Sequence, residues 1–149
     1  MAIPLNKNTN PLDTNKRKFV GIKIPFEKSN GNEGYFESTQ TTIDAVKENI
    51  RNLLYTKKGE RLFQPVLGIG LENYLFETMT QELEMLMKDD IEQAFETWLP
   101  FVTITKLLIT QAGNEQLTTS LENNKINISI DFYINQNPTM LDSVQITLG

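Results

Sequence analysis

The stretch NKINISIDFYIN, residues 124–135, decides the fold, because apolar and polar residues alternate along it without a break. Successive side chains of a β-strand point to opposite faces, so this alternation predicts a strand with one apolar and one polar face. A sheet that is polar on one face is typical of antiparallel sheets. The apolar positions are Ile126, Ile128, Ile130, Phe132 and Ile134.

Three other segments predict further strands. Residues 101–109 are β-rich, with apolar residues at both odd and even positions, and the C-terminal segment alternates at Val144, Ile146 and Leu148. Residues 19–26 form a short β-rich segment stopped by Pro25. Proline has no N–H to donate, so this segment fits an edge strand. Which strand forms the free edge of the sheet is left open.

Two amphipathic helices are predicted between the first strand and the sheet. The first begins at Thr41 or Thr42 and ends with Gly59 as a left-handed C′ residue. The second begins near Thr80 and stops before Pro100. Their apolar stripes are Ile43, Val46, Ile50, Leu53 and Leu54, and then Leu83, Leu86, Met87, Ile91, Ala94, Phe95 and Trp98. We therefore predict an α+β fold with two amphipathic helices packed on one face of a 3–4-stranded antiparallel sheet.

The chain of 149 residues has the length of a single domain. Residues 1–18 are polar and lack periodicity, so they predict a flexible N-terminal arm without a signal peptide, followed by a single domain over residues 19–149. No run of 18 apolar residues predicts a membrane span. The net charge of −5 and the pI of about 4.8 argue against a nucleic-acid partner.

Cysteine and histidine are both absent, which excludes many catalytic chemistries. Without them there is no Ser–His–Asp triad, no thiolate nucleophile and no metal site built on His or Cys. Catalysis would have to rest on carboxylates, Lys, Tyr or backbone groups. We expect no cofactor and no bound metal.

Three interpretations are possible for the segment between the helices, residues 55–77, YTKKGERLFQPVLGIGLENYLFE. Gly68-Ile-Gly70 begins like a dinucleotide fingerprint, but Asn73 stands where the third glycine is needed. A glycosidase needs two carboxylates across a cleft, and nothing in the sequence pairs Glu60 with Glu77 or Glu72 with Asp131. The favoured interpretation is a structural corner, formed by Gly59, Glu60, Arg61, Pro65, Gly68 and Phe76. Its short aromatic segment is expected to return apolar side chains to the core.

This segment resembles the small baseplate-wedge or sheath-initiator family of contractile phage tails, which is shared with type VI secretion baseplates. The resemblance extends from about Phe19 to Leu148 and rests on eleven positions at fixed spacing. These are Thr56, Lys58, Gly59, Glu60, Arg61, Pro65, Gly68, Leu71, Leu75, Phe76 and Glu77. The upstream GIKIPF and YFEST segments resemble phage members of the family.

The resemblance implies a structural protein of the virion, located in the tail baseplate and assembled in the host cytoplasm. Its implied partners are the larger wedge subunits, the tail sheath protein and, further, tube or hub proteins, with no nucleic acid or membrane. The first sheath ring is expected to assemble on the strands that carry Ile126, Ile128, Ile130, Val144, Ile146 and Leu148. An edge strand offers main-chain hydrogen bonds to another chain's strand.

One corner departs from the family pattern. Family members often carry Glu-Pro-Arg at the end of the second helix, where this sequence has Leu99-Pro100-Phe101. Two interpretations fit this replacement better than an ionic contact: a hydrophobic docking contact with the wedge, through Leu–Pro–Phe exposed beside Trp98, or a purely internal corner. Two alternatives stay open. One is a carboxylate-dependent muramidase, because some family members have carried a lysozyme label, although we expect no enzyme. The other is the equivalent subunit of a bacterial type VI secretion baseplate.

Overall fold

The computed structural model describes residues 19–23, 26–29, 35–78, 80–112, 125–135 and 137–149. It divides into two compact units, Met1–Asn52 and Leu53–Gly149, each of which is described by itself. The predicted N-terminal arm lies outside the described residues. A single domain over residues 19–149 stays a prediction.

The first unit contains a two-stranded antiparallel sheet and most of helix α1 (Thr42–Tyr55). Strand β1 (Gly21–Ile22) pairs with β2 (Ser38–Thr39), so two of the described residues in the predicted strand over residues 19–26 are strand. The Lys23 ammonium supports the pairing through an ion pair to Glu37 at 2.9 Å. The rings of Phe26 and Phe36 contact each other in a tilted arrangement, with centroids 5.5 Å apart.

Helix α1 is capped as predicted at its start but ends earlier than predicted. The Thr41 hydroxyl accepts a hydrogen bond from the Asp44 N–H at 3.2 Å. The predicted apolar stripe Ile43, Val46, Ile50, Leu53 and Leu54 is buried throughout. The helix stops at Tyr55, so Gly59 is not its C′ residue and that prediction was wrong. The reason is that the Thr56 carbonyl accepts a hydrogen bond from Ile69 N–H at 3.2 Å, which turns the chain out of the helix.

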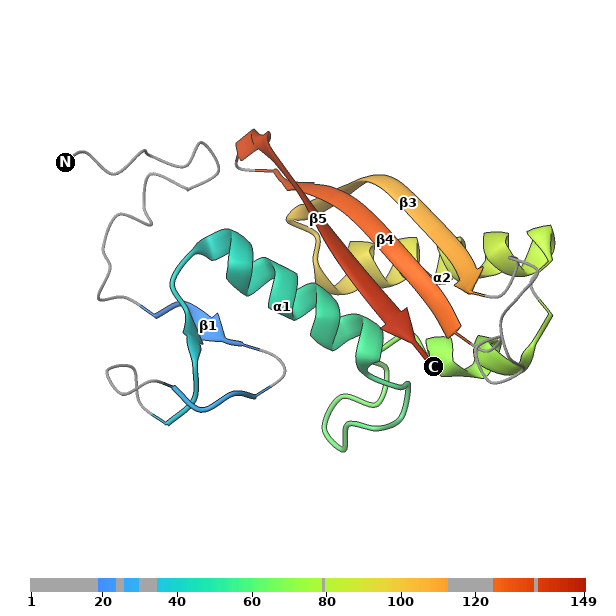
Figure 1. Ribbon diagram of the computed structural model, residues 1–149, viewed down its shortest axis with the longest axis horizontal. Coiled ribbons are helices and arrows are strands. Elements are labelled where there is room, and N and C mark those ends of the chain that lie inside the picture. The colour runs from blue at the N-terminus through green and yellow to red at the C-terminus, as the bar shows by residue number, and fades with distance from the viewer. Residues whose placement is uncertain (1–18, 24–25, 30–34, 79, 113–124, 136) are drawn as a thin grey trace. The chain divides into compact units, whose positions relative to one another are not determined.

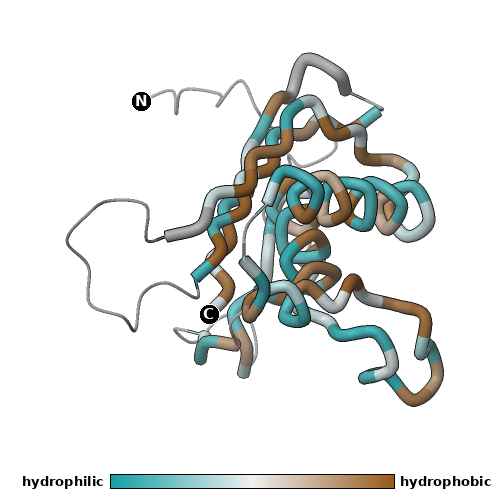
Figure 2. Tube along the Cα trace, turned by 90° about the vertical axis from the view of Figure 1, so that its right-hand side faces the viewer, coloured by the Kyte–Doolittle hydropathy of each residue, from teal (hydrophilic) through white to brown (hydrophobic). Residues whose placement is uncertain are grey.

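The second unit contains the predicted antiparallel sheet, with strand order β3-β4-β5. The strands are β3 (Val102–Ala112), β4 (Lys125–Ile134) and β5 (Asn137–Leu148). Every second residue of β4 is buried, from Ile126 to Ile134, which confirms the alternation in the sequence. Figure 2 shows the same alternation of hydrophobic and hydrophilic residues along the strands. The prediction of an α+β fold with an antiparallel sheet is confirmed.

A β-bulge explains why β3 carries apolar residues at both odd and even positions. The register with β4 shifts between Ile104 and Lys106, which leaves Thr105 as the extra residue. Because of this shift, Ile104 and Leu107 lie opposite the buried residues Phe132 and Ile130 of β4. The apolar face of β3 therefore consists of Val102, Ile104, Leu107 and Ile109, and its other face of Thr103, Lys106, Leu108 and Thr110.

Helix α2 (Gln81–Trp98) lies behind the strands in Figure 1 and contacts β3. It begins next to Thr80 as predicted, and the Thr80 hydroxyl caps it by accepting a hydrogen bond from Leu83 N–H at 3.2 Å. The side chains it buries are Leu83, Met87, Ile91, Ala94 and Phe95. Leu86 was predicted on the same stripe but is 56% exposed, because it lies at the margin of the buried face.

The loop from Thr56 to Gly70 is held shut by a close approach of two backbone segments. Gly68 has φ +110°, and a Cβ added there would lie 2.2 Å from the Thr56 carbonyl oxygen. A second hydrogen bond across the loop joins Gly59 N–H to Pro65 O at 2.7 Å. Only a residue without a side chain permits this closure.

A short 3-10 helix, η2 (Leu71–Phe76), follows the loop and is fixed by polar contacts. The Tyr74 hydroxyl donates a hydrogen bond to the Asp90 carboxylate of α2 at 2.7 Å. An ion pair joins Lys57 to Glu72. The Asp90 hydrogen bond, with partial burial, raises the pKa of Tyr74 to about 12.

We predict that Gly68→Ala destabilises the protein much more than Gly59→Ala. Both glycines have positive φ, but a Cβ at Gly59 meets nothing within 4 Å. Gly59→Ala therefore lowers the free energy of unfolding only by the cost of a left-handed backbone for alanine, about 1–2 kcal/mol. Alanine at Gly68 must also separate the chain from Thr56, so we expect a loss of about 3 kcal/mol or more. Denaturant unfolding of the two variants measures the difference, and equal losses would show that the close approach is not needed.

We also predict that the contribution of Tyr74 to stability disappears at high pH. A raised pKa means that the neutral phenol is favoured in the folded state, so its contribution is complete below pH about 10 and is lost as the pH rises through about 12. Tyr74→Phe should lower the free energy of unfolding by about 0.5–1.5 kcal/mol at neutral pH and by less above pH 10. Absorbance titration of the phenolates in wild type and Asp90→Asn checks the assignment, since Asp90→Asn should lower this pKa. An unchanged titration in Asp90→Asn would contradict it.

Candidate docking surfaces

The tip of the loop between α1 and η2 presents large apolar side chains to solvent. Leu62 is 92% exposed, Phe63 is 98% exposed and Val66 is 70% exposed. The backbone beneath them is ordered by consecutive turns, with hydrogen bonds from Gln64 N–H to Arg61 O at 3.2 Å and from Leu67 N–H to Gln64 O at 3.1 Å. We call Leu62 and Phe63 the loop tip. The sequence interpretation did not predict it as a site. The available signal is an adjacent apolar pair inside a turn-rich segment.

The predicted corner residues surround this loop. The Glu60 carboxylate accepts a hydrogen bond from Lys57 N–H at 3.1 Å, and Arg61 has an interaction within the chain, although both side chains are exposed. The hydrogen bond and ion pair with Glu72 raise the pKa of Lys57. That Glu60 and Arg61 stabilise the corner stays a prediction.

Phe76 does not return to the core as the sequence suggested. It is 84% exposed, whereas Leu71, at the start of the same 3-10 helix, is 1% exposed. The helix has three residues per turn, so it buries one side, and Phe76 falls on another. The apolar return to the core is therefore made by Leu71.

The predicted wedge-docking segment is only partly exposed. Leu99 is buried at 6% exposure, so the exposed Leu–Pro–Phe patch is wrong at this position and the alternative of an internal corner fits Leu99. The cause is the helix end, where Leu99 N–H still bonds to Phe95 O and keeps the side chain inward. Pro100 and Phe101 are exposed, and Trp98 is half-buried.

A groove of about 230 Å³ brings the loop and the C-terminal half of α2 together. Val66 and Gly68 line it from the loop, and Ala94, Thr97 and Trp98 line it from α2. Trp98, predicted as a docking residue, therefore lies beside the predicted structural corner, although 30 residues separate Trp98 from Gly68. The two predicted sites form one continuous surface.

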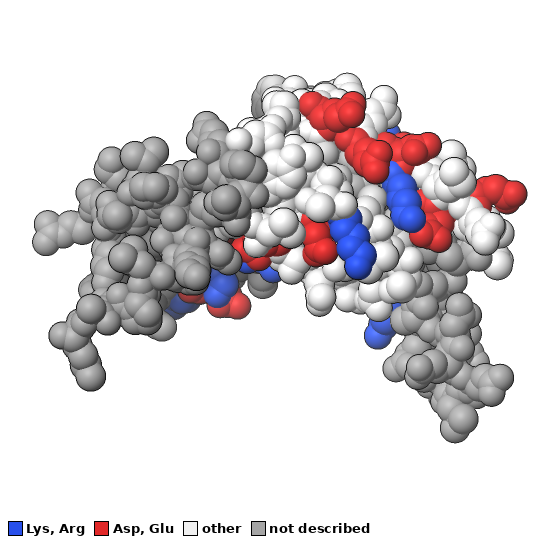
Figure 3. All heavy atoms as spheres, turned by 90° about the horizontal axis from the view of Figure 1, so that it is seen from above, with Lys and Arg blue, Asp and Glu red and all other residues white. Residues whose placement is uncertain are grey.

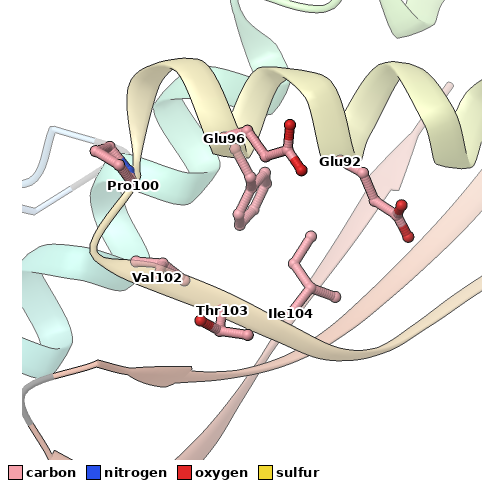
Figure 4. Close-up of a pocket in the computed structure, with 7 residues that line it drawn as sticks. Glu92, Glu96, Pro100, Val102, Thr103 and Ile104 are labelled. Carbon is pink, nitrogen blue, oxygen red and sulfur yellow. The ribbon is translucent and has the colours of Figure 1, made fainter.

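A second cleft, of about 440 Å³, lies between α2 and the start of β3. Figure 4 shows Glu92 and Glu96 extending from α2, while Ile104 points toward the helix from β3. Phe95, Pro100 and Val102 complete an apolar lining. Glu92 and Glu96 are four residues apart, so they fall on one side of the helix. This spacing was the available sequence signal for the cleft.

Helix α2 is strongly acidic. Among its residues, Lys88 is the one cation, and it pairs with Glu84 at 2.6 Å. Figure 3 shows Asp and Glu side chains gathered over the part of the surface where α2 lies. The acidic residues of α2 are Glu82, Glu84, Asp89, Asp90, Glu92 and Glu96. This surface would repel nucleic acid and attract a basic protein surface.

The strand order corrects one of the predicted sheath contacts. Strand β4 pairs with β3 on one side and with β5 on the other, so the main chain at Ile126, Ile128 and Ile130 has no free edge. Their side chains are also buried. Within the described residues, the edges of this sheet are β3 and β5, so a strand-exchange contact would have to use one of these.

The register determines which N–H groups of β5 point away from the sheet. Asn135 N–H donates to Phe101 O at 3.0 Å, so odd-numbered residues of β4 point their N–H toward β3 and even-numbered residues toward β5. The β5 residues that lie opposite even-numbered residues of β4 therefore point their N–H groups toward β4. The residues between them, Ser143, Gln145 and Thr147, point their N–H groups away from the sheet. Ser143 N–H bonds to the Asp142 carboxylate at 2.8 Å, as expected for a group that does not bond to β4.

The carboxylates considered for a muramidase do not come together in a cleft. None of Glu60, Glu72, Glu77 and Asp131 lines the cleft beside Glu92 and Glu96, the groove beside Trp98 or the hollow at Leu108 and Gln145. Within those same residues, no cluster of three or more acidic side chains is arranged to hold a metal ion. No helix in the described part of the chain is long and apolar enough to cross a membrane.

Comparisons with known proteins identify the family. A sequence profile described as baseplate wedge protein gp25 matches residues 40–139. A search of curated protein sequences found no match.

Three solved structures have a similar fold. A protein provisionally named a tail lysozyme, from Geobacter sulfurreducens, has 18% identity and a TM-score of 0.56 over 69% of this chain and 86% of its own. A chain of the anti-feeding prophage baseplate has 21% identity and a TM-score of 0.60 over 75% of this chain and 82% of its own. A chain of the type VI secretion baseplate complex has 14% identity and a TM-score of 0.53 over 71% of this chain and 91% of its own.

At these identities the structures show the fold, whereas the sequence profile, which spans well over half of the chain, shows the family. This agrees with the resemblance found from the sequence, which rests mainly on residues 56–77. The chain belongs to the baseplate wedge protein gp25 family and is a baseplate component of a phage tail or a phage-tail-like particle.

Proposed function

We propose that this protein is a non-enzymatic subunit of the baseplate wedge in a contractile phage tail. It binds the larger wedge subunits and templates the first ring of the tail sheath through its three-stranded sheet. The observation that carries the proposal is the outward-facing main chain of β5, where Gln145 and Thr147 direct their N–H groups away from β4. Such an edge binds an added strand by main-chain hydrogen bonds.

The other edge of the sheet is less suitable for strand exchange. Strand β3 contains the bulge at Thr105, which interrupts its ladder, and the exposed Lys106 follows directly. Bulges and lysines are the devices by which proteins prevent pairing at an edge. In contrast, β5 pairs with β4 in an unbroken register from Leu141 to Leu148. We therefore propose β5 as the sheath-binding strand.

Wedge binding is assigned to the surface around the end of α2. Trp98, Pro100 and Phe101 remain candidates there, and Leu99 supports them from the interior. This surface carries no cation at the position of the family's Glu-Pro-Arg segment, so the contact rests on apolar burial. The GIKIPF and YFEST segments favour a phage tail over a type VI secretion baseplate, and the structures with this fold include an anti-feeding prophage baseplate and a type VI secretion baseplate.

We predict that Gln145→Pro blocks sheath assembly without unfolding the protein. Proline removes an outward N–H and leaves the β4–β5 ladder intact, and edge strands tolerate it. The matched control is Gln145→Ala, which keeps the N–H. Electron microscopy should show baseplates with normal content of the variant but few sheathed tails for Gln145→Pro, and normal tails for Gln145→Ala. Normal sheathed tails with a folded Gln145→Pro variant would remove β5 as the template.

We also predict that the protein does not release peptidoglycan fragments. Muramidase chemistry needs two carboxylates flanking the substrate, and neither Glu60 nor Glu77 lines the cleft beside Glu92 or the groove beside Trp98. A release assay compares the wild type with Glu60→Gln and Glu77→Gln. Release by the wild type that either substitution abolishes would establish the enzyme instead.

A further inference from the structure

We propose that the loop tip, Leu62 and Phe63, is an anchor that inserts into an apolar pocket with an acidic rim on another baseplate protein. This inference rests on the proposed function and adds the residues and the partner chemistry of one wedge contact. Both side chains are more than nine-tenths exposed, and they are adjacent in sequence. Transfer of exposed apolar surface out of water is favourable, so burial of these two side chains against a partner lowers the free energy.

The loop tip is rigidly presented. The backbone on either side is closed by the Gly59 N–H to Pro65 O bond at 2.7 Å and by the Ile69 N–H to Thr56 O bond at 3.2 Å. The close approach of Gly68 to Thr56 fixes the base of the loop. A preorganised loop loses little conformational entropy when it binds, which is the condition for an effective anchor.

The charges near the loop tip define the rim of the partner pocket. Residues 57–61 contain three cations, Lys57, Lys58 and Arg61, and one anion, Glu60. Glu60 bonds to the turn backbone at Lys57 N–H, and Lys57 is engaged by Glu72. Together with Glu72, these residues carry three positive and two negative charges, so a net charge of +1 lies beside the apolar pair and a partner pocket with Asp or Glu at its rim fits best.

A protein partner fits these features better than a membrane or a second copy. Two apolar side chains form a small anchor, and the net charge of −5 and the acidic α2 oppose an anionic bilayer. In a second copy, the loop tip could reach the cleft beside Glu92 and Glu96. Such a head-to-tail contact would extend into open polymers or rings of the free subunit, and two copies of charge −5 repel.

The first experiment measures incorporation into baseplates. The double variant Leu62→Ser/Phe63→Ser is compared with Phe76→Ser, because Phe76 is also a highly exposed phenylalanine, at 84%. Thermal unfolding should give unchanged midpoints for both variants, since neither removes buried surface. Quantitative mass spectrometry of purified baseplates should show at least about tenfold less of the double variant and normal amounts of Phe76→Ser.

The second experiment identifies the contact and does not depend on the fold of a serine variant. A photo-crosslinking benzoyl-phenylalanine replaces Phe63 in one chain and Phe76 in another, and assembled baseplates are irradiated. We expect position 63 to crosslink to another baseplate protein, in a pocket of apolar residues bordered by Asp or Glu, and position 76 not to reach that pocket.

Three results would overturn the anchor. The first is normal incorporation of the folded double variant. The second is a crosslink from position 63 to a second copy of this chain, or self-association that the double variant abolishes. The third is binding of the wild type, but not the double variant, to phosphatidylglycerol vesicles. If the wild type is itself absent from baseplates, the proposed function fails, and this outcome is distinct from failure of the anchor alone.

Discussion

The close approach of Gly68 to Thr56 is the constraint on which the second unit's surface depends. It allows Ile69 N–H to bond to the Thr56 carbonyl, which ends α1 and closes the loop. Closure places η2 where Tyr74 reaches Asp90 of α2. It also leaves Leu62 and Phe63 at the tip with no apolar surface to cover them. The contact between Gly68 and Thr56 therefore determines both the hydrogen bonds that hold the loop and the exposure of Leu62 and Phe63.

The regular elements could be predicted from sequence because their periodicity is local. The alternation in β4, the helix start near Thr80 and the stop before Pro100 each depend on a few neighbouring residues, and the structure confirms them. The bulge in β3 could not be predicted. Its sequence fits two alternations equally well, and the choice depends on which residues of β4 lie opposite, which is a property of the sheet.

The candidate surfaces were predicted less completely, for a physical reason. Residues 55–77 carry the family signature, so the sequence located the important loop. However, the sequence does not distinguish an apolar loop residue whose side chain is buried, such as Leu71, from one whose side chain is exposed, such as Phe63 or Phe76. The reverse error occurred at Leu99, which was expected on the surface and is buried. Burial depends on long-range contacts that a single sequence does not contain.

The two proposed contacts make different demands on the sequence. Recognition at β5 uses main-chain N–H groups, so it needs a straight, unbulged edge but few particular side chains. An anchor at Leu62 and Phe63 needs large apolar side chains and a rigid base, which Gly68 supplies. Chains with only 14–21% identity share this fold. A main-chain contact of the proposed kind depends on the fold more than on particular side chains, so under these proposals specificity for wedge partners would come from the loop tip and the apolar corner at Pro100 and Phe101.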